Sequence, residues 1–275
     1  MALRTFIKMH ALGNDFVVFD ARTSAMALGN EQLQHIASRH RGVGCDQVII
    51  LEPSKKADLI MRIFNADGGE VGACGNAARC VGLFLMEEQK TSEVLIETQS
   101  ALLQCRSISS KLISIDMGEP HLDWQDIPLS RQEDTLHLGI AAGPLENAVA
   151  VNIGNPHAVF FVSDCSSINL RRLGPILETN AVFPERANIS VAEVIDSENI
   201  RLRVWERGTG ITLACGTAAC ATLVAANRRG ICERKANILL DGGVLQIDWQ
   251  KNGRVIMTGP ATKSFTGTID IQHKP

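Results

Sequence analysis

Two matching stretches of the chain decide the fold: residues 61–78 (MRIFNADGGEVGACGNAA) and residues 202–219 (LRVWERGTGITLACGTAA). The second begins 141 positions after the first, and the ungapped alignment has seven identities in eighteen positions. The identical residues are Arg62, Gly69, Ala73, Cys74, Gly75, Ala77 and Ala78. Chance at ordinary composition would give roughly one or two identities. The match therefore predicts a duplicated unit of structure.

The same offset relates other parts of the chain. Adding 141 aligns Gly13-Asn14 with Gly154-Asn155, Val18-Phe19 with Val159-Phe160, Gln47 with Asn188, and Glu52 with Glu193. Four separated segments share one register without a gap, which makes coincidence among apolar patterns the weaker explanation. The period is far too long for a solenoid. We expect two pseudo-symmetric halves of roughly 130 residues each.

Each half is predicted to be a mixed α/β unit with the same order of elements. Runs rich in Val, Ile and Phe predict strands over 15–20, 48–52, 59–65 and 94–98, and over 157–162, 189–193, 200–206 and 238–240. Helices are expected over 31–39, 76–89 and 217–228, with Asn30, Asn76 and Thr217 as N-caps. The last two helices are apolar on most faces, so each is predicted to be a central helix buried among the strands of its half.

The halves are expected to meet at the turn Gly118-Glu119-Pro120. Residues 263–271 predict a last strand that follows the Gly259-Pro260 turn and returns to the first half. We therefore assign residues 1–117 and 262–275 to a first domain and residues 118–261 to a second.

The composition is that of a globular protein in a reducing compartment. Of its 275 residues, 45% are hydrophobic and 21% charged, and the net charge of −3 is too balanced to indicate binding to nucleic acid or to an acidic membrane surface. Residues 1–10 contain no apolar core and no long apolar window occurs, so neither a secretion signal nor a membrane span is expected. Eight dispersed cysteines then predict reduced thiols in the cytoplasm.

Cys74 and Cys215 stand out because the repeat aligns them and because each precedes a predicted helix. The N–H groups and the dipole at a helix N-terminus lower the pKa of a nearby thiol and favour a bound carboxylate. Gly75 and Gly216 permit close approach of the backbone to a ligand. A pseudo-twofold would make the two thiols face one another across an interdomain cleft. One thiolate would then remove an α-proton and the opposite thiol would return one, which inverts a stereocentre.

Other interpretations of the cysteines are weaker. The remaining six are expected to be small buried hydrophobes. A zinc site is disfavoured because Cys74/Cys80 and Cys215/Cys220 lie six and five residues apart and Cys-x-x-Cys is absent. A dithiol redox pair stays open but lacks the usual local motif. A phosphate loop is disfavoured because no Gly-Lys-Ser/Thr follows the glycines.

Polar residues at the ends of predicted strands are candidate ligand contacts. Asn14 and Asn155 match in the repeat, as do the strand ends at Asn65 and Glu206. Glu206 is suited to accept a substrate ammonium or to influence a thiol, and Arg207 to hold a carboxylate. A turn role for the asparagines and a solvent-exposed charge for Arg207 are the structural alternatives.

Four segments together resemble the diaminopimelate epimerase family over essentially the whole chain: residues 9–16 (MHALGNDF), 73–80 (ACGNAARC), 154–157 (GNPH) and 206–217 (ERGTGITLACGT). The resemblance implies a cofactor-independent, metal-free isomerase that interconverts LL- and meso-diaminopimelate in lysine and peptidoglycan-precursor synthesis. It also implies two pseudo-symmetric α/β domains, each with a mixed sheet curled around a central helix, and a homodimer that closes on a small-molecule substrate.

The resemblance implies roles for individual residues as well. Cys74 and Cys215 would be the two acid/base thiols, and His157 and Glu206 would influence them; a satisfied structural imidazole is the alternative for His157. Substrate contacts would come from Asn14, Gln47, Asn65, Gly75, Asn76, Asn155, Asn188, Glu206, Arg207, Gly216 and Thr217.

The chain departs from the family pattern at a few positions. Ala77 and Ala218 stand where many relatives have Gly, Ile211 stands where Glu is frequent, and Phe265 is a candidate replacement for a Tyr at the dimer contact. Two rival functions stay open at this point. One is a proline-type racemase of the same fold, and the other is a non-catalytic carboxylate-binding or redox protein.

Overall fold

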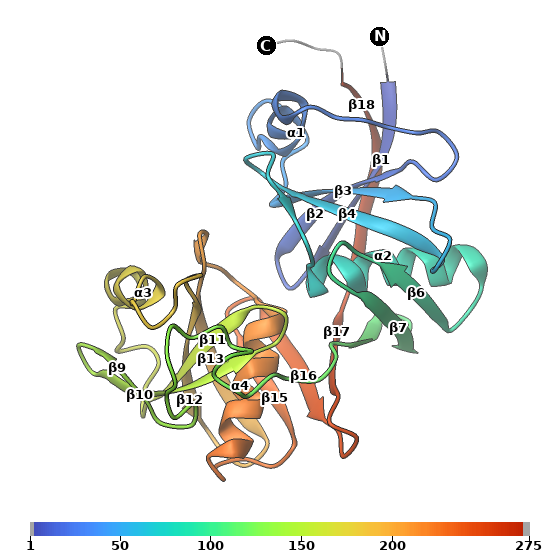
Figure 1. The fold of residues 1–275 in the computed structure, drawn as a ribbon. Coiled ribbons are helices and arrows are strands. Elements are labelled where there is room, and N and C mark those ends of the chain that lie inside the picture. Colours follow the sequence, from blue (N-terminus) through green and yellow to red (C-terminus); the bar gives the residue numbers. More distant parts are fainter. Residues whose placement is uncertain (1–2, 272–275) are drawn as a thin grey trace. The chain divides into compact units, whose positions relative to one another are not determined.

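The computed structural model describes residues 3–271, which form two compact units (Figure 1). The first unit takes in the described residues up to Ile115 and from Gly259 onward, and the second unit is Asp116–Thr258. The helices are α1 (Asn30–Ala37), α2 (Gly75–Gln89), α3 (Leu170–Glu178) and α4 (Gly216–Arg228). Within the described part of the chain, none of them is both long and apolar enough to cross a membrane.

The first unit is a mixed sheet in which β1 and β18 run side by side. Its strands are β1 (Leu3–Ala11), β2 (Asn14–Asp20), β3 (Gln47–Glu52), β4 (Leu59–Asn65), β5 (Glu70–Val71), β6 (Glu93–Glu97), β7 (Leu102–Ser109), β8 (Leu112–Asp116) and β18 (Thr262–Asp270). The pairing order is β18-β1-β2-β3-β4-β6-β7-β8, with β5 also on β4. The pairs β2–β3 and β4–β6 are parallel and the others antiparallel. The predicted return of the last strand to the first half is confirmed.

Strands β2, β3 and β4 lie between helices α1 and α2 (Figure 1). Val17 and Val48 face α1 and pack with Leu33 and Ile36 of that helix. Their neighbours in sequence point to the opposite face of the sheet, because side chains alternate along a strand. Helix α2 contacts β1, β6, β7 and β18, and nearly all of it is buried. Burial on both faces explains why these strands are continuous apolar runs.

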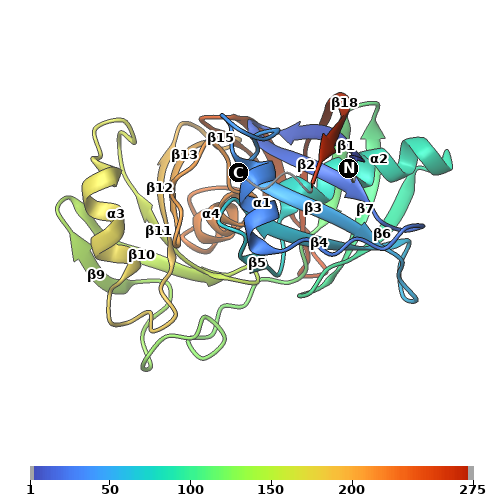
Figure 2. The same cartoon turned by 90° about the horizontal axis from the view of Figure 1, so that it is seen from above.

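The second unit repeats this architecture. Its strands are β9 (Leu138–Ala142), β10 (Leu145–Asn152), β11 (Pro156–Phe161), β12 (Asn188–Val194), β13 (Asn199–Glu206), β14 (Gly210–Ile211), β15 (Lys235–Leu240), β16 (Gly243–Trp249) and β17 (Val255–Pro260). They pair in the order β9-β10-β11-β12-β13-β15-β16-β17, with β14 also on β13. Figure 2 shows β12 and β13 between α3 and α4, and both helices contact these strands.

The two units share the register that the sequence predicts. Strands β2, β3 and β4 begin at 14, 47 and 59, and β11, β12 and β13 begin at 156, 188 and 199, so the differences are 142, 141 and 140. Helices α2 and α4 begin at residues 75 and 216, which are 141 positions apart in the sequence. The mixed α/β class, the duplication and the buried central helices are confirmed, and the bounds of each predicted strand agree with the structure to within three residues.

The predicted N-caps are wrong. The helix expected over 31–39 spans Asn30–Ala37 and is capped by Gly29. Helices α2 and α4 begin one residue earlier than predicted, and their N-caps are Cys74 and Cys215 themselves. Both cysteines have extended backbone, with φ of −150° and −125°. This is the conformation that N-cap residues adopt, so the two thiols lie one residue closer to their helices than expected.

Candidate active site

The predicted site residues lie at equivalent ends of the strands and at the start of the central helix in each unit. In the first unit, Asn14 and Gln47 begin β2 and β3, and Asn65 ends β4. In the second, Asn188 begins β12 and Glu206 ends β13, while Asn155 immediately precedes β11. We name the first set, with Cys74, Gly75 and Asn76, half-site 1. Half-site 2 is the second set with His157, Arg207, Cys215, Gly216 and Thr217.

In half-site 1 the Cys74 thiol lies between a helix N-terminus and an amide. The backbone N–H of Ala77 donates to Cys74 Sγ at 3.5 Å, and the thiol donates to Asn14 Oδ1 at 3.9 Å. The Asn76 Nδ2 group donates to the same Asn14 oxygen at 3.2 Å. The helical N–H favours the thiolate form of Cys74, whereas the amide oxygen favours the thiol form. Cys74 is thus contacted by one group suited to each state of an acid/base residue.

Asn14 reaches this position because of a tight β1–β2 turn. Ala11 and Asn14 are paired across the turn, and Leu12 and Gly13 both have positive φ, 54° and 84°. Two-residue hairpin turns of this kind need positive φ at both central positions. Glycine takes that conformation without strain, which gives Gly13 a structural role. The turn therefore fixes the first residue of β2 beside the start of α2.

Gln47 and Asn65 form a second polar pair in half-site 1. They are register partners of β3 and β4, and Gln47 Nε2 donates to Asn65 Oδ1 at 2.9 Å. The Gln47 oxygen is buried and has no hydrogen-bond partner among the described residues. A buried acceptor without a partner is unusual in a folded protein. It is suited to receive a donor such as a ligand ammonium.

In half-site 2 the Cys215 thiol is buried, with 6% of the residue exposed. Burial raises its pKa well above the ordinary value, and the negative charge of Glu206 raises it further. Thr217 Oγ1 lies 3.5 Å from Cys215 Sγ, and Thr212 donates a hydrogen bond to the Glu206 carboxylate. Both effects keep Cys215 in the thiol form at neutral pH.

A Cβ atom at Gly216 would lie 2.8 Å from the sulfur of Met257. Such contacts are closer than real Cβ atoms make. A residue with a side chain at position 216 would therefore collide with Met257, which gives Gly216 a packing role in its own unit.

Asn188 connects β11, β12 and the Glu206-Arg207 segment. Its Nδ2 donates to the backbone oxygen of Pro156 at 3.3 Å, and its Oδ1 accepts from the backbone N–H of Arg207 at 2.9 Å. The Arg207 guanidinium donates to the backbone oxygen of Glu185 at 2.8 Å. Asn188 therefore positions the segment that carries Glu206, in addition to any ligand contact of its own.

His157 is fully buried next to Asn155. Burial lowers its pKa from 6.5 to about 3, and the positive charge of Arg207 adds to the effect. The imidazole is therefore neutral at physiological pH. Its Nε2 lies 2.8 Å from Asn155 Oδ1, while its buried Nδ1 has no partner among the described residues.

The other cysteines have the environment of hydrophobic core residues. Burial raises the pKa of Cys45, Cys80, Cys105 and Cys165 to about 12, and it also raises that of Cys232. All eight cysteines of the chain are thiols in this structure. With these raised pKa values the five thiols stay protonated at neutral pH, and none of them caps one of the four helices.

Several residues that support the half-sites were missed by sequence reasoning. Glu178 of α3 accepts from Trp205 Nε1 at 2.7 Å and from the backbone N–H of Gly208 at 3.0 Å, on either side of Glu206-Arg207. Arg79, fully buried in α2, donates to Asn76 Oδ1 at 2.8 Å. The available signal for Arg79 was a charged residue within the apolar part of the helix, residues 77–86. No local pattern marks Glu178, because its partners are distant in sequence.

Comparison with known proteins gives one consistent result. The family model described as diaminopimelate epimerase matches residues 6–122 and 149–264. A diaminopimelate epimerase of Rhodospirillum centenum is 52% identical over 269 residues, which cover 97% of this chain and 92% of that protein. One from Acidiphilium cryptum is 50% identical over 269 residues, covering 98% and 97%.

Solved structures with much lower identity share the fold. A hydroxyproline epimerase from Agrobacterium vitis has a TM-score of 0.70 at 15% identity, covering 98% of this chain and 91% of that one. A PhzF-family phenazine biosynthesis protein from Bacillus anthracis has a TM-score of 0.66 at 18% identity, covering 98% and 99%. The similarity at this level concerns the fold alone.

Proposed function

The chain belongs to the diaminopimelate epimerase family, and on that premise we propose that it interconverts LL- and meso-2,6-diaminopimelate without a cofactor. The observation that carries the proposal is the pair of thiols that cap the central helices at 141-residue spacing, Cys74 on α2 and Cys215 on α4. The reaction belongs to lysine and peptidoglycan-precursor synthesis.

The proposed chemistry uses the thiols as two bases. One thiolate takes the proton from the α-carbon of the substrate and becomes a thiol. The other thiol gives its proton to the opposite face of the same carbon and becomes a thiolate. One C–H bond breaks and one forms, so the substrate is inverted and the two sulfurs exchange protonation states. The reverse reaction uses the same groups in exchanged roles.

The α-carboxylate of the substrate is proposed to bind the N–H groups at a helix start. The first N–H groups of α2 and α4, at Gly75-Asn76 and Gly216-Thr217, supply donors and the positive end of a helix dipole. Negative charge develops on the substrate when the α-proton leaves, and fixed donors of this kind stabilise it.

The second amino-acid end of diaminopimelate requires further polar anchors. We assign these to the amide pair Gln47–Asn65, to Asn188 and to Arg207, and we assign the reacting ammonium to Glu206. The Gln47 oxygen supports the assignment, since it is a buried acceptor with no donor among residues 3–271. A small cyclic substrate such as proline has no group that would use these anchors.

We also propose a cytoplasmic homodimer. A reducing compartment keeps eight thiols reduced, which a thiol-dependent enzyme requires. Phe265 of β18 is 52% exposed although it contacts Phe6 edge-on at 6.0 Å, and the two border a cavity of about 450 Å³ with Val43 and Ile269. Light scattering of the purified protein tests the dimer, and Phe265→Glu is expected to weaken it.

The function is tested by incubating the protein with LL-diaminopimelate in heavy water without pyridoxal phosphate. The proposal expects formation of the meso isomer with one deuterium at the inverted α-carbon. Proline and hydroxyproline are offered in parallel. Exchange into those compounds alone would identify a racemase of the other substrate class, and a binding protein would incorporate no deuterium at all.

A further inference from the structure

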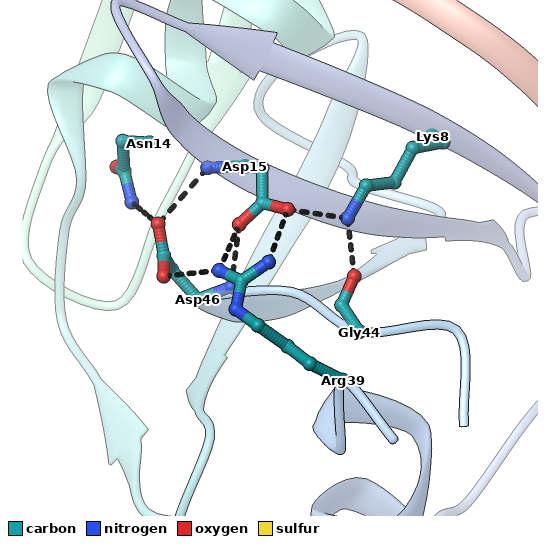
Figure 3. Close-up of polar contacts among 6 residues, drawn as sticks. All are labelled: Lys8, Asn14, Asp15, Arg39, Gly44 and Asp46. Carbon is teal, nitrogen blue, oxygen red and sulfur yellow. Dashed lines mark hydrogen bonds and ion pairs between the residues drawn. The ribbon is translucent and has the colours of Figure 1, made fainter. Parts of the chain in front are cut away.

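A cluster of four charged residues lies next to Asn14 of half-site 1: Lys8, Asp15, Arg39 and Asp46 (Figure 3). Arg39 lies between two carboxylates, with its Nη2 at 2.8 Å from Asp15 Oδ1 and 2.7 Å from Asp46 Oδ1. Lys8 Nζ lies 2.6 Å from Asp15 Oδ2 and also donates to the backbone oxygen of Gly44. The Asp46 N–H donates to Asp15 Oδ1 at 2.9 Å, so backbone and side chains hold the cluster together.

The cluster is connected to Cys74 through one amide side chain. Asp46 Oδ2 accepts from Asn14 Nδ2 at 3.0 Å and from the backbone N–H of Asp15 at 3.1 Å. Because the nitrogen of the Asn14 amide faces the carboxylate, its oxygen faces the other way, toward Asn76 Nδ2 and the Cys74 thiol. An isolated amide has two nearly equivalent orientations, and a carboxylate can accept from only one of them.

The far end of this hydrogen-bond chain is also fixed by a charge. Arg79 donates to Asn76 Oδ1 at 2.8 Å, which turns the Asn76 nitrogen toward Asn14. The chain therefore runs from the Arg79 cation through two amides to the Asp46 anion, with every donor pointing the same way. Charged groups at both ends make this polarity much more stable than its reverse.

The second unit has no equivalent of the cluster, although the rest of the architecture repeats. Adding 141 to Lys8, Asp15, Arg39 and Asp46 leads to Val149, Pro156, Asn180 and Ala187, none of which is charged. There the matching amide, Asn155, has its oxygen at 2.8 Å from His157 instead. The charged cluster occurs only in the first unit, and its hydrogen bonds lead through Asn14 to Cys74. This indicates a role specific to half-site 1.

We propose that Asp46 is a positioning residue that fixes the Asn14 amide with its oxygen toward Cys74, so that half-site 1 holds this thiol by an acceptor. The inference rests on the proposed function for its catalytic meaning, but the amide orientation is a property of the first unit alone. Within that unit, the charged and titratable groups connected to the thiol include Arg79 and Cys80 of α2 and the four-residue cluster behind Asn14.

The test is Asp46→Asn, made in the wild-type protein and in an Asn14→Ala background. Cys74 alkylation by iodoacetamide is followed against pH by mass spectrometry of the Cys74 peptide. In the wild-type background a released amide can turn its NH₂ group to the sulfur, and the alkylation midpoint is expected to fall by roughly half a pH unit or more. In the Asn14→Ala background Asp46→Asn is expected to cause no shift, because the group that transmits the effect is missing.

The double comparison separates positioning from simple charge. If Asp46 acted only through its charge, Asp46→Asn would lower the alkylation midpoint equally in both backgrounds, and that result would overturn the proposal. An unchanged midpoint in the wild-type background would overturn it as well. Asp20→Asn is the matched control: Asp20 also binds an arginine, Arg22, but at the other end of β2, and it is expected to leave the midpoint unchanged.

Epimerisation is measured on the same variants. Turnover of LL-diaminopimelate by Asp46→Asn is expected to fall about tenfold with little change in thermal midpoint, since Asp46 lies at the surface. Because the alkylation readout needs no substrate, an inactive wild-type protein would refute the proposed function while leaving the positioning role to be decided by the pH midpoints.

Discussion

His157 Nε2 lies 2.8 Å from the side-chain oxygen of Asn155, inside a fully buried site. Since burial keeps the imidazole neutral, this nitrogen carries the proton that the Asn155 oxygen accepts. The oxygen of Asn155 is thereby occupied and its NH₂ group is left to donate. In Asn14 the arrangement is the opposite, with the NH₂ group bound and the oxygen presented. The two repeat-related amides therefore offer different groups.

Neutral His157 makes the protein sensitive to mild acid. The unfolded chain binds a proton on this residue below about pH 6.5, and the folded protein does not until about pH 3. The stability that the neutral imidazole contributes is complete above pH 6.5 and is lost as the pH falls. The free energy of unfolding is expected to drop by roughly 2 kcal/mol by about pH 5. His157→Phe, which installs the residue of the repeat-equivalent Phe16, is expected to flatten this dependence. Urea unfolding across this pH range measures it, and equal slopes for both proteins would contradict it.

Loss of either capping thiol is expected to abolish epimerisation. Cys74→Ala and Cys215→Ala each remove one of the two proposed proton carriers, and turnover should fall by roughly a thousandfold or more. Circular dichroism is expected to show an intact fold, since both residues lie at helix ends. Cys80→Ala serves as a control for general cysteine loss. Full turnover in either single variant would refute the two-base scheme.

Activity is also expected to depend on reductant. In the proposed scheme the two thiols act on one substrate carbon, and such thiols can oxidise to a disulfide.

Glu206 is expected to control the reactivity of Cys215. After burial, its negative charge is the next cause of the raised thiol pKa. Glu206→Gln removes the charge, so the thiolate becomes easier to form and alkylation of Cys215 at fixed pH should accelerate severalfold. Site-resolved mass spectrometry after iodoacetamide treatment measures the rate. Glu193→Gln, on the same sheet, is the charge-matched control, and identical Cys215 rates in all three proteins would disprove the link.

Asp15 is expected to be the stabilising centre of the charged cluster. Burial opposes its ionisation, but hydrogen bonds from Arg39 and Lys8 outweigh it and hold the pKa of Asp15 well below its usual range. Asp15→Asn leaves the nearly buried Lys8 ammonium without its counter-ion and should cost about 2–4 kcal/mol of unfolding free energy. Asp20→Asn, at a more exposed ion pair, should cost less than about 1 kcal/mol. Urea midpoints at neutral pH compare them, and equal losses would argue against a special role for Asp15.

The central strands and the central helix of each half were predictable because the duplication gave two independent views of one architecture. A strand that is ambiguous in one half, such as 48–52, is supported by its partner at 189–193. Helix α3 was missed although α1 was expected, since Pro175 lies inside it and interrupts the helical pattern. The offset between the halves could have predicted this helix, because α3 begins 140 residues after α1.

The candidate site was predictable only in part, for a physical reason. Cys74 and Cys215 are marked by a local motif, and so are Asn14 and Glu206. Asp46 and Glu178 act through partners 32 and 30 residues away, and only folding brings them to the half-sites. Their role is to orient other side chains, which leaves no spacing rule in the chain.

The position of β18 has a consequence for biosynthesis. It pairs with β1 along nearly its whole length, yet it follows every residue of the second unit. During translation one edge of β1 therefore has no paired strand until β18 is synthesised. Residues 116–258 emerge before that and can fold as one continuous segment. The ribosome thus completes the second unit before the first, and the earliest part of the chain is among the last to become fully native.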